Sequence, residues 1–192
     1  ALRVIIFVVV MGTVSSALLV GMNSFTAPLI FKNEELKIKS AVLEVLEIPY
    51  DQQNALAIFS DKVKVLKKDN YTFYASAEGS VAFEFNGPGL WGPVSGMASI
   101  NSDLKTIKTI KILHQEETPG LGGRIAEFSF LKQFRGKEFL PKLLFTPEGR
   151  ASAKNEVDAI TGATGSSKAL EKLLNETLQK NATLLNGLAG SR

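Results

Sequence analysis

The sequence DAITGATGSS, at residues 158–167, joins a short apolar segment to a turn of small and hydroxyl-bearing residues. Four leucines recur at helical spacing between residues 170 and 178, so this turn opens a helix with one apolar face. Small side chains let a ligand approach the backbone, and the free amides of a helix N-terminus favour a phosphate. The competing interpretation, favoured by spacing alone, is a capped turn in which Ser166 or Ser167 serves only the helix.

The chain before this turn has strand-like patterning from about residue 63. Short apolar runs separated by turn signals predict strands at residues 63–66, 71–77, 81–85, 97–100 and 105–114, with turns at 67–70, 86–89 and 101–103. Helices are expected at residues 24–48, 51–59 and 125–134, and extended segments near 139–145 and 156–160. A run of strands with helices at the flanks is typical of an α+β domain with an antiparallel sheet.

Two helix starts are assigned from capping signals. The helix at 24–48 is expected to begin at Ser24 or Thr26, with Pro28 in its first turn, and to end before Pro49. The helix at 51–59 is expected to begin at Asp51.

Residues 4–22 carry no charge and consist mainly of large apolar residues. A helix of that length measures about 28 Å, close to the thickness of the hydrocarbon core of a membrane. The alternative, a cleaved signal peptide, has an apolar region of only about 7–15 residues. We therefore expect a transmembrane helix at residues 1–23, embedded through residues 4–22, and one domain at residues 24–192.

The flanks of this span indicate its orientation and its neighbours. Arg3 precedes the span and the next cation is Lys32, so the positive-inside rule favours an internal N-terminus and an external domain. Thr13, Ala17 and Gly21 recur every four residues, and such a small-residue stripe lets another membrane helix approach closely. Other membrane subunits are therefore expected as partners.

Composition excludes several kinds of site. The chain has no cysteine, which excludes a disulfide framework, a thiolate zinc site, a cysteine lipid anchor and an iron–sulfur cluster ligated by this chain. His114 is its one histidine, so we expect no metal site. The net charge of +3 gives no argument for binding nucleic acid. Mean hydropathy is +0.10, in keeping with the apolar N-terminal segment.

Two further loops are candidates for ligand contact. HQEETPGLGG, at residues 114–123, has glycines that permit close backbone approach, although such loops mostly form turns. Its carboxylates Glu116 and Glu117 are of a kind usually solvated on loops. GPGLWGP, at residues 87–93, holds Trp91, which either fills the core, the interpretation favoured from the loop alone, or forms a wall for a flat aromatic ligand.

Taken together, GLWG at 89–92, ETPGLG at 117–122 and DAITGAT at 158–164 resemble the FMN-binding domain of two membrane-complex subunits. These are the G subunit of the Rnf ion-translocating complex and the C subunit of the sodium-pumping NADH:quinone reductase. With the N-terminal span, the resemblance covers essentially the whole chain. It implies an FMN joined through its phosphate to the hydroxyl of Thr164, the last residue of a Ser/Thr-Gly-Ala-Thr motif completed by Thr161, Gly162 and Ala163.

The resemblance also implies surroundings for the cofactor. The phosphoester carries roughly one negative charge, which the helix start at Ser166, Ser167 and Lys168 can accommodate. The residues expected around the flavin ring are Leu90, Trp91, Glu117, Thr118, Gly120 and Leu121. The resemblance implies a separate exported flavin transferase, and no group in the chain is placed to activate Thr164. The transferase would use FAD as donor and recognise Asp158, Gly162, Ala163 and Thr164.

The resulting hypothesis is a covalent-FMN electron carrier anchored in the cell (inner) membrane by one span, with its FMN domain on the extracytoplasmic side. In a Rnf-type complex, which couples electron transfer between ferredoxin and NAD to ion translocation, it would relay electrons without independent catalytic activity. The chain is nearer in length to the Rnf protein. Alternatives are the C-type subunit of the quinone reductase, an FMN domain of another exported reductase and, from a different class, a cofactor-free membrane-tethered binding module.

Overall fold

The computed structural model describes residues 1–68 and 70–189 and separates at residues 39 and 40 into two compact units. The expected turn at 67–70 includes Asp69, and the expected domain ends with residues 190–192; these residues lie outside the described part. Helix α1 (Leu2–Leu46) forms the first unit and contributes its last residues to the second.

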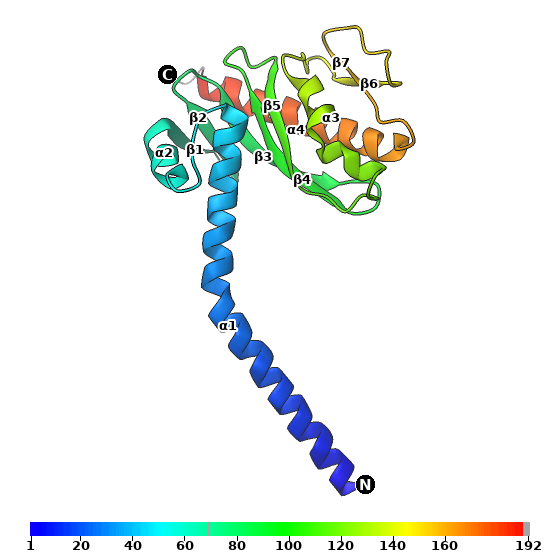
Figure 1. Ribbon diagram of the computed structural model, residues 1–192. Helices are drawn as coiled ribbons and strands as arrows, with labels where there is room; N and C mark the ends of the chain where they lie inside the picture. Colours follow the sequence, from blue (N-terminus) through cyan, green and yellow to red (C-terminus); the bar gives the residue numbers. More distant parts are fainter. Residues whose placement is uncertain (69, 190–192) are drawn as a thin grey trace. The chain divides into compact units, whose positions relative to one another are not determined.

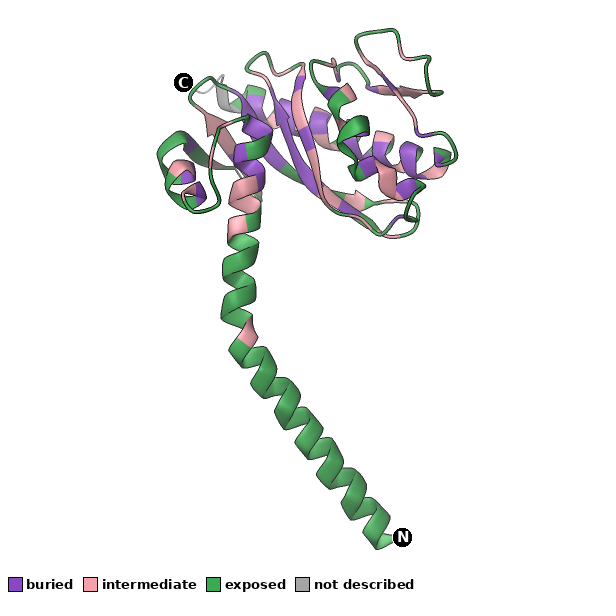
Figure 2. Ribbon diagram, in the orientation of Figure 1, coloured by how far each residue is buried: buried purple, intermediate pink, exposed green. Residues whose placement is uncertain are grey.

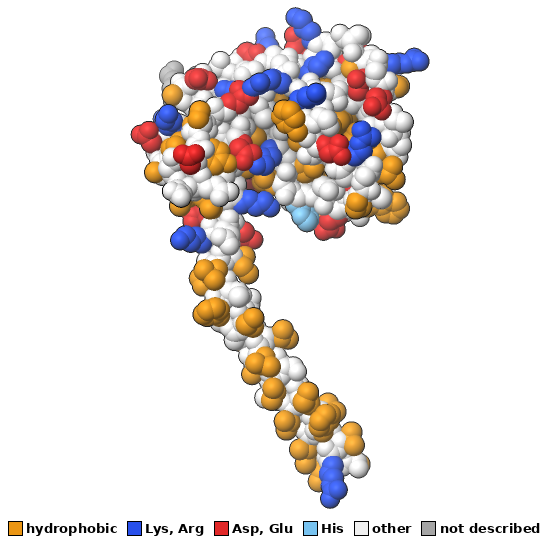
Figure 3. Space-filling model, viewed as in Figure 1, with side chains coloured by type: hydrophobic (Ala, Val, Ile, Leu, Met, Phe, Trp, Pro, Cys, Tyr) orange, Lys and Arg blue, Asp and Glu red, His pale blue; other side chains and the backbone are white. Residues whose placement is uncertain are grey.

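The first unit is an apolar helix. Its best 18-residue window has a mean hydropathy of 2.5, and it is the one helix of the described residues long and apolar enough to cross a membrane. Apolar side chains are spread along most of its length in Figure 3, with charged side chains near its two ends. The Thr13 hydroxyl donates a hydrogen bond to the Val9 carbonyl at 2.8 Å, so this polar group is satisfied within the helix, as a lipid environment requires.

The expected start of a second helix at Ser24 or Thr26 is wrong, because α1 continues through this region without a break. The Thr26 hydroxyl donates back to the Met22 carbonyl at 2.9 Å instead of capping a new helix. Pro28 lies inside the helix, where it removes one backbone donor. The prediction that Pro49 lies beyond the helix end is confirmed, since α1 ends at Leu46.

The second unit contains a five-stranded antiparallel sheet with the order β1-β2-β3-β4-β5 (Figure 1). The strands are β1 (Val63–Lys68), β2 (Tyr71–Ser76), β3 (Val81–Pro88), β4 (Pro93–Ile100) and β5 (Ile107–His114). The five predicted strands and the α+β class are thus confirmed. Helix α2 (Ala55–Lys62) begins after the expected Asp51, because the Asn54 amide oxygen accepts a 2.7 Å hydrogen bond from the Asp51 amide and closes a turn before the helix.

Helix α4 (Thr164–Ala189) covers one face of this sheet and supplies the predicted leucine face. Leu170, Leu173, Leu174 and Leu178 are all buried, which stabilises the domain by about 1.5–3 kcal/mol for each side chain. The approach is close: a Cβ added at Gly87 of β3 would lie 2.5 Å from the Leu173 side chain. The buried residues in Figure 2 therefore concentrate between sheet and helix.

The segment expected as one helix at 125–134 is instead three short pieces: η1 (Gly122–Ala126), α3 (Phe128–Leu131) and η2 (Lys132–Phe134). Glu127 has extended backbone angles, which ends η1 and redirects the chain. This bend lets Phe130 and Phe134 pack edge-on against each other and both against Phe145. The prediction of a continuous helix is wrong because burial of these rings outweighs helix continuity.

A second, two-stranded sheet lies beyond these pieces. Strands β6 (Leu144–Thr146) and β7 (Glu156–Asp158) pair in parallel within the two segments expected to be extended. Asn175 of α4 binds the chain just before β6, accepting from the Leu143 amide and donating to the Leu143 carbonyl, both at 2.8 Å. Helix α4 thus holds the small sheet beside the large one.

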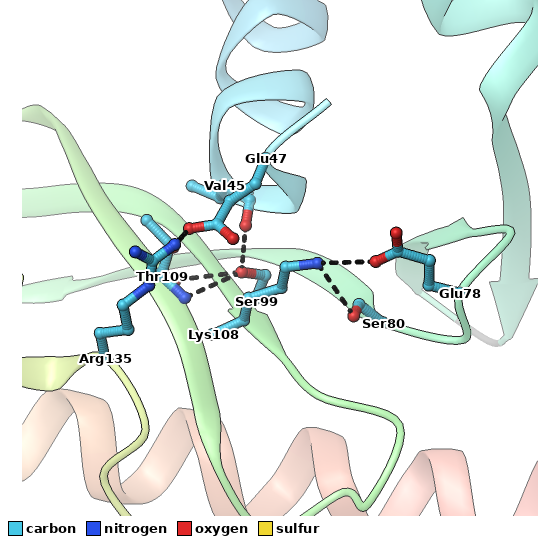
Figure 4. Close-up of polar contacts among 8 residues, drawn as sticks. All are labelled: Val45, Glu47, Glu78, Ser80, Ser99, Lys108, Thr109 and Arg135. Atoms are coloured by element: carbon cyan, nitrogen blue, oxygen red, sulfur yellow. Dashed lines mark hydrogen bonds and ion pairs between the residues drawn. The ribbon is translucent and has the colours of Figure 1, made fainter. Parts of the chain in front are cut away.

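The last residues of α1 pack on the sheet face opposite α4 (Figure 4). The buried Ser99 hydroxyl donates to the Val45 carbonyl and accepts from the Thr109 amide at 3.1 Å. Glu47 adopts a left-handed conformation (φ 60°) just after the helix, and its carboxylate pairs with Arg135. Lys108 of β5 pairs with Glu78 at 3.2 Å.

Replacing Ser99 by alanine is expected to lower the free energy of unfolding by about 1–3 kcal/mol, because the Val45 carbonyl and the Thr109 amide each lose a buried partner. Urea unfolding of the full chain in detergent measures the change. Ser102→Ala, in the exposed turn after β4, is the matched control and is expected to change stability by less than about 0.5 kcal/mol. Equal stability of the two variants would contradict this role for Ser99.

Candidate functional site

The turn into α4 places two threonines at the surface. Gly162 has φ +82°, a conformation that favours glycine, and the Ala163 amide donates to the Ile160 carbonyl at 3.0 Å. The buried Ser167 hydroxyl accepts from the Ile160 amide at 3.1 Å, so Ser167 holds the turn from a position inside α4 and does not cap the helix. Thr161 and Thr164 remain exposed on this rigid turn, and Thr164 is the first residue of the helix.

A cavity of about 380 Å³ adjoins Thr164. One wall is the turn and the first helical turn of α4, including Lys168, which follows Thr164 by four residues and so shares its helix face. A second wall, which the sequence did not predict, consists of Phe145, Thr146, Pro147 and Glu148. The volume of the cavity falls in the range of small-molecule binding sites.

Two carboxylates hold the connection between β6 and β7 that borders this cavity. Asp158 accepts hydrogen bonds from the amides of Arg150 and Ala151 at 3.0 and 2.9 Å. Glu156 accepts from the amides of Ser152 and Ala153, both at 3.0 Å, and these hydrogen bonds hold the pKa of Glu156 below its ordinary value. Asp158, expected to be read by a flavin transferase, therefore also shapes the chain beside the cavity.

Glu117 joins the loop of residues 89–92 to the first turn of α4. Its side chain is buried, contrary to the solvated carboxylate typical of a loop. One carboxylate oxygen accepts from the amides of Leu90 and Trp91, at 2.7 and 3.2 Å. The other oxygen accepts from the buried Ser166 hydroxyl at 2.6 Å. Glu117 therefore connects all three motifs that the sequence analysis singled out.

Glycines make room for this connection. A Cβ at Gly89 would lie 2.4 Å from one oxygen of Glu117, and a Cβ at Gly122 would lie 2.9 Å from the other and 2.4 Å from the Ser166 hydroxyl. A side chain at either position would collide with Glu117 or its partner. The glycines of these loops are thus needed for close packing around a carboxylate, in addition to any ligand contact.

Three apolar side chains of the two glycine loops are exposed; we call Leu90, Trp91 and Leu121 the apolar rim. Their exposed fractions are 52%, 74% and 48%. Leu90 lies over Gly165, where an added Cβ would be 2.7 Å from its side chain, and Leu121 lies 3.5 Å from the corresponding position at Gly162. The core interpretation of Trp91 is wrong, because the indole lies mostly in solvent; the second interpretation, a wall for a flat ligand, remains.

Three further residues expected to contact FMN are Thr118, Gly120 and Ser166. The Thr118 carbonyl accepts from the amides of Leu121 and Gly123 at 3.1 and 2.9 Å, and Gly120 has φ +73° in the same turn. Thr118 and Gly120 are exposed beside the apolar rim. Ser166 instead points toward Glu117 and is buried, away from the surface that Thr164 and Lys168 share.

The sequence is similar to one family model and to subunits of two membrane complexes. Residues 89–179, which include all three motifs, match the family model described as FMN-binding domain. Over 160 residues, 77% of this chain, the sequence is 28% identical to the G subunit of the proton-translocating ferredoxin:NAD(+) oxidoreductase complex of Clostridium ljungdahlii, of which 84% is covered. Over 142 residues, 64% of this chain, it is 30% identical to the C subunit of the Na(+)-translocating NADH-quinone reductase of Vibrio anguillarum, of which 56% is covered.

Residues 89–179 are thus similar to the FMN-binding domain family, and the chain is similar in sequence to both of these proteins. It spans between 34% and 56% of the length of the first quinone-reductase relatives. The crystal structure of the Na(+)-translocating NADH-quinone reductase C subunit from Parabacteroides distasonis shares its fold, with a TM-score of 0.69 at 24% identity over 78% of this chain and 92% of that chain. The predicted relationship is therefore confirmed at the level of the domain, without a choice between the Rnf and quinone-reductase proteins.

Replacing Gly122 by alanine is expected to lower the free energy of unfolding by about 1–3 kcal/mol, because the new methyl group separates Ser166 from Glu117. Gly123→Ala is the matched control, since its Cβ would meet its nearest neighbours at 3.4 Å, an ordinary contact. Chemical unfolding of both variants in detergent measures the difference. Equal stabilities would show that the packing around Glu117 tolerates a side chain.

Proposed function

We propose that this protein is a membrane-anchored electron carrier whose FMN is attached covalently, through its phosphate, to the Thr164 hydroxyl. The observation that carries the proposal is the position of Thr164: an exposed hydroxyl at the first residue of a long helix, within an FMN-binding domain and beside a cavity of about 380 Å³. The helix N-terminus stabilises negative charge there.

The residues present fit an FMN. Gly162, with its positive φ, leaves the backbone next to Thr164 without a side chain, and Lys168 supplies a positive charge one turn along the same helix face. The apolar rim offers an indole and two aliphatic side chains to a flat aromatic ring, and the glycine loops of residues 89–92 and 120–123 add open backbone beside it. FMN, when bound, would accept and release electrons at its ring.

Attachment uses Thr164 as the nucleophile. Its hydroxyl oxygen forms a bond to the phosphorus of the FMN half of FAD, the pyrophosphate bond breaks, AMP leaves and the hydroxyl proton is released. The one histidine, His114, pairs with exposed Glu116 at 3.2 Å and is therefore engaged away from this task. A separate flavin transferase, which recognises residues 158–164, supplies the activation.

The setting that we propose is a Rnf-type complex, with the domain on the extracytoplasmic side and other membrane subunits as partners. The similarity to the Clostridium ljungdahlii protein extends over 77% of this chain, against 64% for the Vibrio anguillarum protein. Arg3, in the first turn of α1 and ahead of the uncharged stretch at residues 4–22, supports the orientation through the positive-inside rule. The carrier would pass electrons between partner subunits and would not select a substrate itself.

Thr164→Val is expected to abolish covalent flavin in chain co-expressed with a flavin transferase, because valine lacks the hydroxyl that forms the ester. Flavin fluorescence in a denaturing gel and the mass of the tryptic peptide at residues 155–168 measure attachment. Thr161→Ser is the matched control: it changes an exposed threonine of the same turn, keeps a Ser/Thr residue at the first position of the motif and is expected to retain the flavin. Flavin that persists in Thr164→Val, or an unmodified peptide throughout the wild-type sample, would overturn the proposal.

A further inference from the structure

Trp91 has few contacts of its own to fix its position. Its side chain is 74% exposed, so packing constrains it little. Within its loop, the Gly89 amide donates to the Gly92 carbonyl at 2.8 Å and closes a tight turn around residues 90 and 91. The backbone of residues 90 and 91 is joined to the rest of the domain through the Glu117 carboxylate. The backbone position of residue 91, from which the indole projects, therefore depends on this carboxylate.

The same carboxylate reaches the helix that bears Thr164. Its second oxygen accepts from Ser166, two residues after Thr164, and the side chains of Glu117 and Ser166 are both buried. A buried carboxylate with three donors holds its partners more strongly than a neutral acceptor does, because hydrogen bonds to a charged group are shorter and stronger. A negative charge near the helix N-terminus is also favourable. Glu117 thus fixes the distance between the loop of Trp91 and the first turn of α4.

We propose that Glu117 is a positioning residue that holds the Trp91 indole beside the flavin attached at Thr164. This inference rests on the proposed function. The sequence predicts that Glu117 lies near the flavin ring. In this proposal, Glu117 acts on the flavin through Trp91.

Two substitutions of Glu117 distinguish the effect of its hydrogen bonds from the effect of its negative charge. Glu117→Gln keeps an acceptor for the amides of Leu90 and Trp91 and a group that can bond to Ser166, and so is expected to preserve the loop. Glu117→Leu has a similar size but accepts no hydrogen bond, so both amides and the Ser166 hydroxyl lose their partner. Glu116→Gln is the matched control, because it removes an exposed carboxylate from the adjacent position.

Trp91 is the only tryptophan in the sequence, so tryptophan fluorescence reports on this loop alone. The first experiment uses the full chain in detergent, made without a flavin transferase and shown by circular dichroism to be folded. Time-resolved anisotropy is expected to show a gain of fast motion at Trp91 in Glu117→Leu, and wild-type behaviour in Glu117→Gln and Glu116→Gln. Unchanged motion in folded Glu117→Leu would overturn the proposal.

The second experiment measures flavin fluorescence per attached flavin in chain co-expressed with the transferase. An adjacent indole quenches a flavin, so Glu117→Leu is expected to gain fluorescence toward the level of Trp91→Phe, whereas Glu117→Gln is expected to stay at the wild-type level. Equal fluorescence in all four chains would overturn the placement of Trp91. Absence of flavin from the wild-type chain would instead refute the proposed function, and the anisotropy measurement would still decide the role of Glu117 in holding the loop.

Discussion

The packing of α4 on the sheet is the interaction on which the rest of the domain depends. Its leucine face buries the inner side of the five strands, and its close approach requires Gly87 on β3. Asn175 on the same helix holds the chain that leads into β6. One helix thereby fixes the large sheet, the small sheet and, at its own N-terminus, the turn that carries Thr164. A rigid scaffold of this kind places a surface residue accurately.

The candidate site is assembled from loops far apart in the sequence, and two carboxylates join them. Glu117 links residues 90 and 91 to residue 166, while Asp158 ties residues 150 and 151 to the end of β7. Both carboxylates accept hydrogen bonds from backbone amides, so these bonds depend on the geometry of the loops. Glu117 accepts in addition from the Ser166 hydroxyl. The exposed groups that remain, the apolar rim, Thr164 and Lys168, are those suited to contact a ligand.

The sequence contained enough to predict the antiparallel sheet and the closing helix, because the alternation of strands and the leucine spacing are local patterns. It failed where tertiary packing decides the backbone. Burial of the phenylalanines broke the segment at 125–134 into three pieces, and the tight turn of residues 89–92 leaves Trp91 mostly in solvent. The roles of Thr164, Thr161 and Lys168 stay predictions, since their surface positions alone assign no cofactor. The wall at residues 145–148 carries no local motif by which it could have been found.

The position of Thr164 has a consequence for the order of events in maturation. Its side chain lies outside the hydrophobic core, while the hydrogen bonds that shape its turn are made by Ile160, Ala163 and Ser167. If the flavin is attached as proposed, the polypeptide can therefore complete its tertiary structure first and receive the prosthetic group afterwards, on a finished surface. An enzyme that loads it would read a preformed contour, and a chain awaiting loading would already be a stable protein.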